Sequence, residues 1–343
     1  MRSPPVGAMM ALTRMVEQFW WRKRPPPAWL MPLSMSYQWL NRRNLAQRNA
    51  QAEPPPLPWI SVGNITVGGS GKTPFVLWLA AQLVARGWHP VLVCRGDGGR
   101  HGRGALPQRV LVDADPRQVG DEACMMAQAS GLPVLAGRDR VQAARMAVEC
   151  GDIMILDDGF QYRQLAHTLG KSCDVVLLPA TGLGNGALLP LGPLREPVTA
   201  LARADVVVAS GEGRGNLPPI AARMWAWSNP VVSLKDGVTG AETMPDRVVV
   251  VAGIARPQRM VASLQQLGVT VIHHHFFPDH HRYGARDVEP LLSQPLPVVT
   301  SAKDAVKLHA MWPKTRPLWV CQHHPQAELG LINAILAHIS MTA

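Results

Sequence analysis

The residues best suited to chemistry form a glycine-rich loop with the sequence Thr66-Val-Gly-Gly-Ser-Gly-Lys-Thr73. Glycines let backbone amides converge on phosphate oxygens, and the start of a following helix adds partial positive charge. Lys72 can reach terminal phosphates and Thr73 can offer its hydroxyl to Mg²⁺. Thr66 stands where the usual pattern begins with glycine. We predict that a nucleotide contacts Thr66, Gly68, Gly69, Ser70, Gly71, Lys72 and Thr73.

Two acids at the end of an apolar run form the second chemical signal. The run reads Asp152-Ile-Met-Ile-Leu-Asp157-Asp158-Gly159. In phosphate-loop enzymes a carboxylate at the carboxyl end of a neighbouring strand holds the metal, either directly or through water. Consecutive residues of a strand point to opposite faces, so one of Asp157 and Asp158 should reach the metal unless the chain already turns there.

Short apolar runs that alternate with helical patterns must position these residues. This alternation predicts an α/β fold, a P-loop NTPase-like parallel sheet covered by helices. We place the phosphate-loop core domain at 51–225 and a second, smaller α/β domain at 226–343. The predicted strands are 60–62, 91–94, 110–112, 134–136, 153–156, 175–178 and 206–209 in the first domain, and 248–251, 269–272, 298–300 and 318–320 in the second.

The first 50 residues differ in composition from the rest of the chain. They contain eight Lys or Arg and one acid, Glu17, whereas the whole chain carries a net charge of +10. Apolar residues recur at helical spacing in two stripes, which are Leu12, Met15, Val16, Phe19 and Trp20, and then Leu30, Leu33, Tyr37 and Leu40. Cations beside Trp and Leu are typical of helices at a lipid headgroup layer. We predict a basic amphipathic, membrane-associating helical segment at 1–50; the alternative is a helix packed on the protein's own core.

Composition excludes several classes of protein. With 47% hydrophobic and 17% charged residues, the 343-residue chain is neither disordered nor a polytopic membrane protein. The five cysteines are widely spaced, which argues against a disulfide framework and fits a reducing cytoplasm. Because the basic residues gather at one end, we expect no nucleic-acid partner. We also expect a monomer.

Separated motifs along nearly the whole chain resemble the tetraacyldisaccharide 4′-kinases, which phosphorylate the lipid A precursor of Gram-negative bacteria. They occur in the order of that family. The segments are Gly63-Asn64 with the phosphate loop through Pro74, Arg95-Gly96, Gly98-Gly99, Gly120-Asp121-Glu122-Ala123, 156–161, Gly184-Asn185-Gly186, 188–190, 192–197, 203–205, 252–254, Pro278-Asp279-His280 and 303–308.

The resemblance implies a reaction and a place. The γ-phosphate of ATP would pass to the 4′-hydroxyl of tetraacyldisaccharide 1-phosphate, an anionic glycolipid, at the cytoplasmic face of the inner membrane. Asp121 would be the base, and His280, paired with Asp279, would orient or share the proton. Thr73, Asp157, Asp158 and Glu196 would arrange Mg²⁺. Candidates for substrate contacts are Arg140, Arg195 and Asn185, although Arg195 could instead pair with Glu196.

Some positions depart from the family pattern, and other functions stay open. Asp97, Tyr162 and Ala302 stand where the family typically has Tyr, His and Glu, which bears on local metal or nucleotide contacts. Glu122 could simply stabilise a helix N-terminus. The main alternative function is a membrane-associated P-loop ATPase that acts as a hydrolysis switch. A nucleic-acid-binding protein is a third option.

Overall fold

The computed structural model divides the chain into two compact units. Unit 1 comprises Met1–Val91, Arg140–Ser228 and Ala327–Ala343, and unit 2 comprises Leu92–Asp139 and Asn229–Gln326. Residues 92–139 are thus grouped with the C-terminal half of the chain. The structure describes residues 16, 18–21, 25–68, 70–97, 99, 106–211, 217, 223–242 and 244–339. Leu12 and Met15 of the first predicted apolar stripe, and Gly69 of the predicted nucleotide site, lie outside these ranges.

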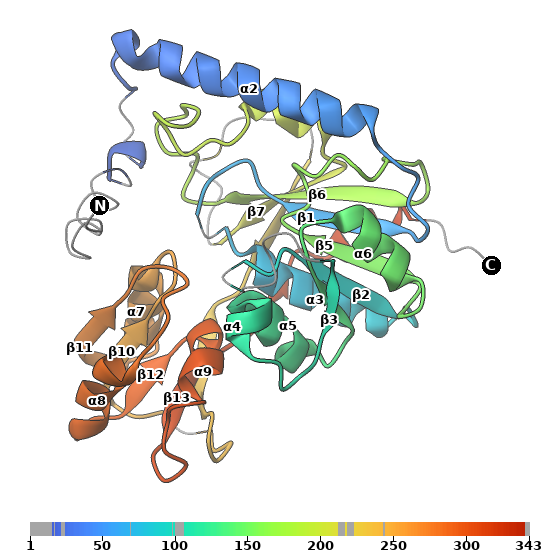
Figure 1. Cartoon of the computed structure of the whole chain (residues 1–343). Helices are drawn as coiled ribbons and strands as arrows, with labels where there is room; N and C mark the ends of the chain where they lie inside the picture. Colours follow the sequence, from blue (N-terminus) through green and yellow to red (C-terminus); the bar gives the residue numbers. More distant parts are fainter. Residues whose placement is uncertain are drawn as a thin grey trace. The chain divides into compact units, whose positions relative to one another are not determined.

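The sheet of unit 1 is parallel and carries the phosphate loop. Its strands run in the order β8 (Met224–Ser228), β7 (Val206–Ser210), β6 (Ser172–Pro179), β1 (Trp59–Gly63) and β5 (Ile153–Asp157). Figure 1 labels β7, β6, β1 and β5 of this sheet. Every residue of β1, β5 and β6 is buried, as expected of strands covered on both faces. Val62 pairs with Asp157 in register, so the acid lies beside the start of the phosphate loop.

Helices of unit 1 follow the predicted alternation. They are η1 (Ala28–Leu30), α2 (Met31–Ala50), α3 (Lys72–Val84), α6 (Arg140–Ala147), η3 (Val198–Arg203) and α10 (Leu331–Leu336). Phe75 and Leu79 of α3 are fully buried, which fixes this helix and therefore Lys72 at its first position. The short strand β14 (Gln326–Ala327) crosses the boundary between the units in sequence.

Unit 2 contains two groups of strands. In the first, β2 (Pro90–Cys94) pairs in parallel with β4 (Val134–Ala136), which pairs antiparallel with β3 (Gln108–Val110). The second is a five-stranded sheet of order β11 (Thr270–Phe276), β10 (Arg247–Ala252), β12 (Val298–Thr300), β13 (Leu318–His323) and β9 (Val231–Asp236). The helices of unit 2 are α4 (Pro116–Val119), α5 (Asp121–Ser130), α7 (Pro257–Gln266), α8 (Ala285–Ser293) and α9 (Ala302–Leu308).

The predicted α/β fold is confirmed, with two antiparallel edges that the sequence did not indicate. Each predicted strand overlaps an observed one. Strands β8, β9 and β14 were not predicted. In β9 the buried residues are interspersed with exposed and half-buried ones, and the strand pairs antiparallel with β13, so it lacks the continuous apolar run of a covered parallel strand.

Helix α2 accounts for much of the predicted N-terminal segment. Ser34 is its buried residue, whereas large apolar side chains on α2 and η1 are exposed, namely Trp29, Met31, Leu33, Met35, Trp39 and Leu40. The membrane-binding amphipathic character stays a prediction. Among the helices of the described ranges, none combines the length and apolar character needed to span a bilayer.

Candidate active site

The phosphate loop joins β1 to α3 and is held by the segment 193–195. Val67 donates its N–H to the Pro193 carbonyl (2.7 Å), and Arg195 donates its N–H to the Ile65 carbonyl (2.7 Å). Within the loop, the Asn64 amide donates to Ser70 Oγ (2.8 Å). Gly71 has φ +79°, and a Cβ there would lie 3.0 Å from Ser210 Oγ, so this position requires glycine. These contacts hold the described residues of the loop in place ahead of α3.

Lys72 and Thr73, the first residues of α3, meet the two predicted metal carboxylates. Thr73 Oγ1 donates to Asp157 Oδ2 (3.1 Å), and Lys72 Nζ lies 3.3 Å from Asp158 Oδ1. Strand β5 ends at Asp157, and Asp158 adopts a left-handed conformation with φ 53°. Asp tolerates this conformation better than most residues. The turn at Asp158 thus lets both consecutive acids contact the first turn of α3.

Arg195 and Glu196 belong to different ion pairs. Arg195 Nη1 lies 3.0 Å from both carboxylate oxygens of Asp158. The buried Glu196 accepts from Arg203 (2.8 Å) and from the Gln161 amide (3.2 Å). Arg195 therefore pairs with an acid of the metal pair rather than with Glu196. A role of Glu196 toward Mg²⁺ stays a prediction.

The other two predicted substrate residues are engaged with the protein. Arg140 is only 2% exposed, and its Nη2 donates to the Asp157 carbonyl (3.0 Å). The Asn185 amide donates to the Leu191 carbonyl (2.9 Å), while its oxygen accepts from the Ala187 N–H (3.1 Å). Arg140 thus contacts the end of β5, at the first of the two predicted metal carboxylates, and Asn185 stabilises its own loop. Their contacts with substrate stay predictions.

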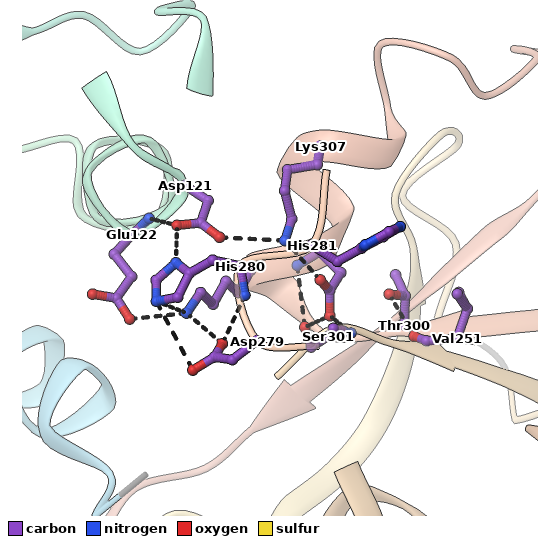
Figure 2. A network of polar contacts seen from close by, with 12 residues as sticks. Asp121, Glu122, Val251, Asp279, His280, His281, Thr300, Ser301 and Lys307 are labelled. Carbon is purple, nitrogen blue, oxygen red and sulfur yellow. Dashed lines mark hydrogen bonds and ion pairs between the residues drawn. The ribbon is translucent and has the colours of Figure 1, made fainter. Parts of the chain in front are cut away.

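Asp121 and His280 are hydrogen-bonded to each other in unit 2. Figure 2 shows their side chains pointing toward one another, Asp121 from the first turn of α5 and His280 from the loop after β11, with His280 Nδ1 2.9 Å from Asp121 Oδ1. Gly120 precedes α5 with φ +97°, and a Cβ there would lie 2.6 Å from the Asp97 carbonyl oxygen, so this position requires glycine. His280 has φ 60° and donates its backbone N–H to Asp279 Oδ1 (3.0 Å). Among these groups, the imidazole is closer to Asp121 than to Asp279, whose Oδ2 is 3.9 Å from Nε2.

Two lysines of α9 complete this cluster. Lys303 Nζ contacts Glu122 Oε1 and Asp279 Oδ1, each at 3.0 Å, and His280 Nε2 at 3.2 Å. Lys307 Nζ lies 3.2 Å from Asp121 Oδ2 and 2.9 Å from Asp304 Oδ1. The ion pair with Lys303 gives Glu122 a partner beyond the helix N-terminus. All of these residues belong to unit 2.

The electrostatics of the cluster favour an ionised Asp121. Burial by itself would raise the pKa of this carboxyl, but the hydrogen bond from His280 and the charges of Lys303, His280 and Lys307 lower the pKa to about 2. The hydrogen bond to Asp121 raises the pKa of His280, against burial and the Lys303 charge. Burial lowers the pKa of Lys303, but the carboxylates of Glu122, Asp121 and Asp279 raise it by more. The pKa of Lys303 therefore lies above its ordinary value, and this lysine is cationic.

Lys303 and Lys307 were not assigned a role from the sequence. The signal was present in the segment Lys303-Asp-Ala-Val-Lys-Leu308, because lysines four apart lie on one face of a helix. What the sequence did not supply was the partner of that face. The carboxylates they contact lie as many as 186 residues away.

Fold and site together define the class of protein. A parallel sheet, a glycine-rich loop that opens a helix with Lys-Thr, and acids at the end of the neighbouring strand are the parts of a P-loop nucleotide-dependent phosphotransferase. A carboxylate and an imidazole in contact add an acid–base pair.

Comparison with known proteins identifies the family. The family model described as tetraacyldisaccharide-1-P 4′-kinase matches residues 27–340. The tetraacyldisaccharide 4′-kinase of Halorhodospira halophila is 38% identical over 315 residues, 89% of this chain and 90% of the relative. That of Azoarcus sp. is 42% identical over 306 residues, 84% of this chain and 85% of the relative. The chain therefore belongs to the tetraacyldisaccharide 4′-kinase family, which confirms the resemblance and the enzyme class predicted from the sequence.

A solved structure supports the same assignment. The "apo" form of LpxK from Aquifex aeolicus, crystallised in complex with ATP, superposes with a TM-score of 0.72 at 26% identity. The match covers 89% of this chain and 97% of that one. The fold of the chain is thus that of a kinase whose structure was determined with ATP.

Proposed function

We propose that this chain transfers the γ-phosphate of ATP to the 4′-hydroxyl of tetraacyldisaccharide 1-phosphate. The observation that carries this proposal is the phosphate loop whose Lys72 and Thr73 contact Asp158 and Asp157, in a member of a 4′-kinase family. Phosphoryl transfer depends mainly on positioning and on neutralising charge, and these residues supply both.

In unit 1, Lys72 and the loop amides bind the phosphates of the nucleotide. The oxygens around Thr73 fit Mg²⁺, which prefers hydroxyl and carboxylate ligands and usually takes one or two carboxylates together with substrate phosphates. Thr73, Asp157 and Asp158 would hold the ion, with Glu196 as a further candidate. When bound, Mg²⁺ supplies positive charge to the β- and γ-phosphates. Arg195 keeps the Asp158 carboxylate oriented through its contacts with both oxygens.

In unit 2, Asp121 receives and orients the acceptor hydroxyl. Its carboxylate is held by His280 through Oδ1 and by Lys307 through Oδ2. A carboxylate fixed in this way can align a hydroxyl and accept its proton as the new O–P bond forms. His280 orients Asp121, and Asp279 orients the backbone of His280.

Helix α2 connects the proposed membrane surface with the nucleotide site. The Tyr37 hydroxyl (3.2 Å) and the Asn41 amide (3.1 Å) both donate to the Arg195 carbonyl, and Ser34 Oγ donates to the Leu188 carbonyl (2.9 Å). The exposed apolar side chains of η1 and α2 suit the headgroup layer of an anionic membrane, where a lipid substrate is found. We propose that the chain binds the inner-membrane surface peripherally through this helix.

Radiolabelled ATP separates the kinase from the alternative of a hydrolysis switch. The full chain is incubated with [γ-³²P]ATP, Mg²⁺ and tetraacyldisaccharide 1-phosphate in mixed micelles. The kinase predicts label in the lipid, and little labelled free phosphate when the lipid is left out. Release of labelled phosphate that does not depend on the lipid, with none incorporated into it, would favour the switch.

A further inference from the structure

Among the described residues, Lys303 is the charged side chain nearest to Nε2 of His280. Its ammonium lies 3.2 Å from Nε2, and it also contacts Glu122 and Asp279. An ammonium group has three donors and no acceptor. The contact with Nε2 is therefore a hydrogen bond only if Nε2 carries no proton, so that its lone pair can accept the hydrogen bond that Lys303 donates.

The contact on the other side of the ring is consistent with this. Nδ1 lies 2.9 Å from Asp121 Oδ1, and an ionised carboxylate can only accept. A neutral imidazole with its proton on Nδ1 forms both hydrogen bonds at once. The tautomer with its proton on Nε2 would direct N–H at an ammonium and a lone pair at a carboxylate, so it would lose both bonds.

We propose that Lys303 is a positioning residue that selects the neutral, Nδ1-protonated form of His280, and that His280 in this form acts as a hydrogen-bond donor to Asp121. The inference rests on the proposed function only in what it says about catalysis. It means that His280 holds Asp121 ionised and oriented, and that Asp121 cannot pass its proton to Nδ1, which already carries one.

The charges around the imidazole make Lys303 the deciding group. Among the residues that the structure describes, the titratable side chains that face His280 are Asp121 from α5, Asp279 from its own loop and Lys303 from α9. The two carboxylates favour the imidazolium, whereas Lys303 opposes it. Lys307 faces Asp121 and Asp304, and among the contacts of the described residues none joins its ammonium to the imidazole. This makes Lys307 a matched control, a lysine of the same helix that contacts Asp121, the carboxylate bonded to His280.

The tautomer can be measured directly by long-range ¹H–¹⁵N NMR on the full chain labelled at histidine. The resonances of His280 are assigned by their loss in His280→Gln. Above the pKa of His280, the wild-type protein should show a protonated Nδ1 and an unprotonated Nε2. Lys303→Met should weaken this preference, because Nε2 loses its donor while Asp121 still accepts from Nδ1, and it should raise the pKa of His280, because a like charge is removed. Lys303→Arg, which retains a cationic donor, should restore both.

Lys307→Met should leave the tautomer of His280 unchanged. The proposal is overturned if wild-type His280 carries its neutral-form proton on Nε2, or if Lys303→Met leaves both tautomer and pKa as they were. Should Lys303→Met fail to fold, the wild-type spectrum still decides between the tautomers. Because these spectra need no substrate, their outcome is independent of the lipid phosphorylation assay that tests the proposed function.

Discussion

The Lys72 ammonium lies 3.3 Å from Oδ1 of Asp158, so the lysine of the phosphate loop and one acid of the metal pair are already joined. Arg195 contacts the same carboxylate. Asp158 is therefore balanced by two cations, whereas Asp157 contacts the Thr73 hydroxyl. Within the proposed metal site we therefore infer different roles for the two acids. We propose that Asp157 contacts Mg²⁺ directly, and that Asp158, which pairs with Lys72 and Arg195, keeps these cations in place and holds the ion less directly.

The two acids can be separated by their effect on magnesium. Asp157→Asn should raise the Mg²⁺ concentration needed for half-maximal activity by about tenfold or more, because it removes a charged oxygen ligand. Asp158→Asn should change this Mg²⁺ requirement less and should mainly raise KM for ATP, because it releases Lys72 and Arg195. Activity measured across a magnesium series for each variant checks this. Equal magnesium dependence of the two variants would contradict the assignment.

Asp121→Asn should reduce kcat by about 10² or more, since the amide orients but cannot take the hydroxyl proton. Affinity for ATP should stay near that of the wild type, because Asp121 is assigned to the acceptor. The rate of lipid phosphorylation and a nucleotide titration measure the two quantities. Glu289→Gln, at an exposed position of α8, is the control and should leave both unchanged. Near-normal turnover of Asp121→Asn would remove Asp121 from the role of base.

The depressed pKa of Asp121 also makes a prediction about stability. The folded state lowers this pKa from 3.8 to about 2, so ionisation of Asp121 stabilises the fold above the unfolded-state value. That stabilisation, about 2 kcal/mol, is lost as pH falls from about 4 toward 2. Urea unfolding of the wild type and Asp121→Asn should show a difference in unfolding free energy that shrinks across this window. A difference that is constant or grows as pH falls would contradict the pKa assignment.

The hydrogen bonds that join α2 to the Arg195 carbonyl should contribute to ATP affinity. The double variant Tyr37→Phe with Asn41→Leu removes both donors to the Arg195 carbonyl. We expect ATP affinity to fall about two- to tenfold, the equivalent of one or two lost hydrogen bonds. Calorimetry without membranes makes the measurement. Met35→Ser, on an exposed part of the same helix, should bind ATP as the wild type does. Identical ATP affinities of all three proteins would show that the hydrogen bonds from α2 to Arg195 do not influence nucleotide binding.

Local patterns account for much of this fold. The phosphate loop and the strand that ends in Asp157 could be predicted because apolar runs and glycines act over a few residues. Strand β9 could not, since an antiparallel edge strand needs only one apolar face. The left-handed Asp158 was also hidden, because its conformation follows from the contacts that its carboxylate makes with Lys72 and Arg195.

Fewer contacts of the candidate site than elements of the fold could be predicted from the sequence. Asp121 and His280 were proposed as functional from a family resemblance, but their direct hydrogen bond joins positions 159 residues apart. Arg140 was predicted as a candidate substrate contact, and the sequence did not indicate that its guanidinium is buried and donates to the Asp157 carbonyl. Lys303 and Lys307 carry no chemical signature without their carboxylates. Long-range pairing of charges is the part of the molecule that a single sequence does not display.

Calorimetric titration of the folded full chain with ATP in the presence of Mg²⁺ tests the central claim, that Lys72 and its loop bind the phosphates of a nucleotide. We predict a single binding event for the wild type, and a loss of affinity of at least about tenfold for Lys72→Met, in which a cation is replaced by an apolar side chain of similar length. No heat of binding to the well-folded wild type, or equal affinity of the two proteins, would contradict the account.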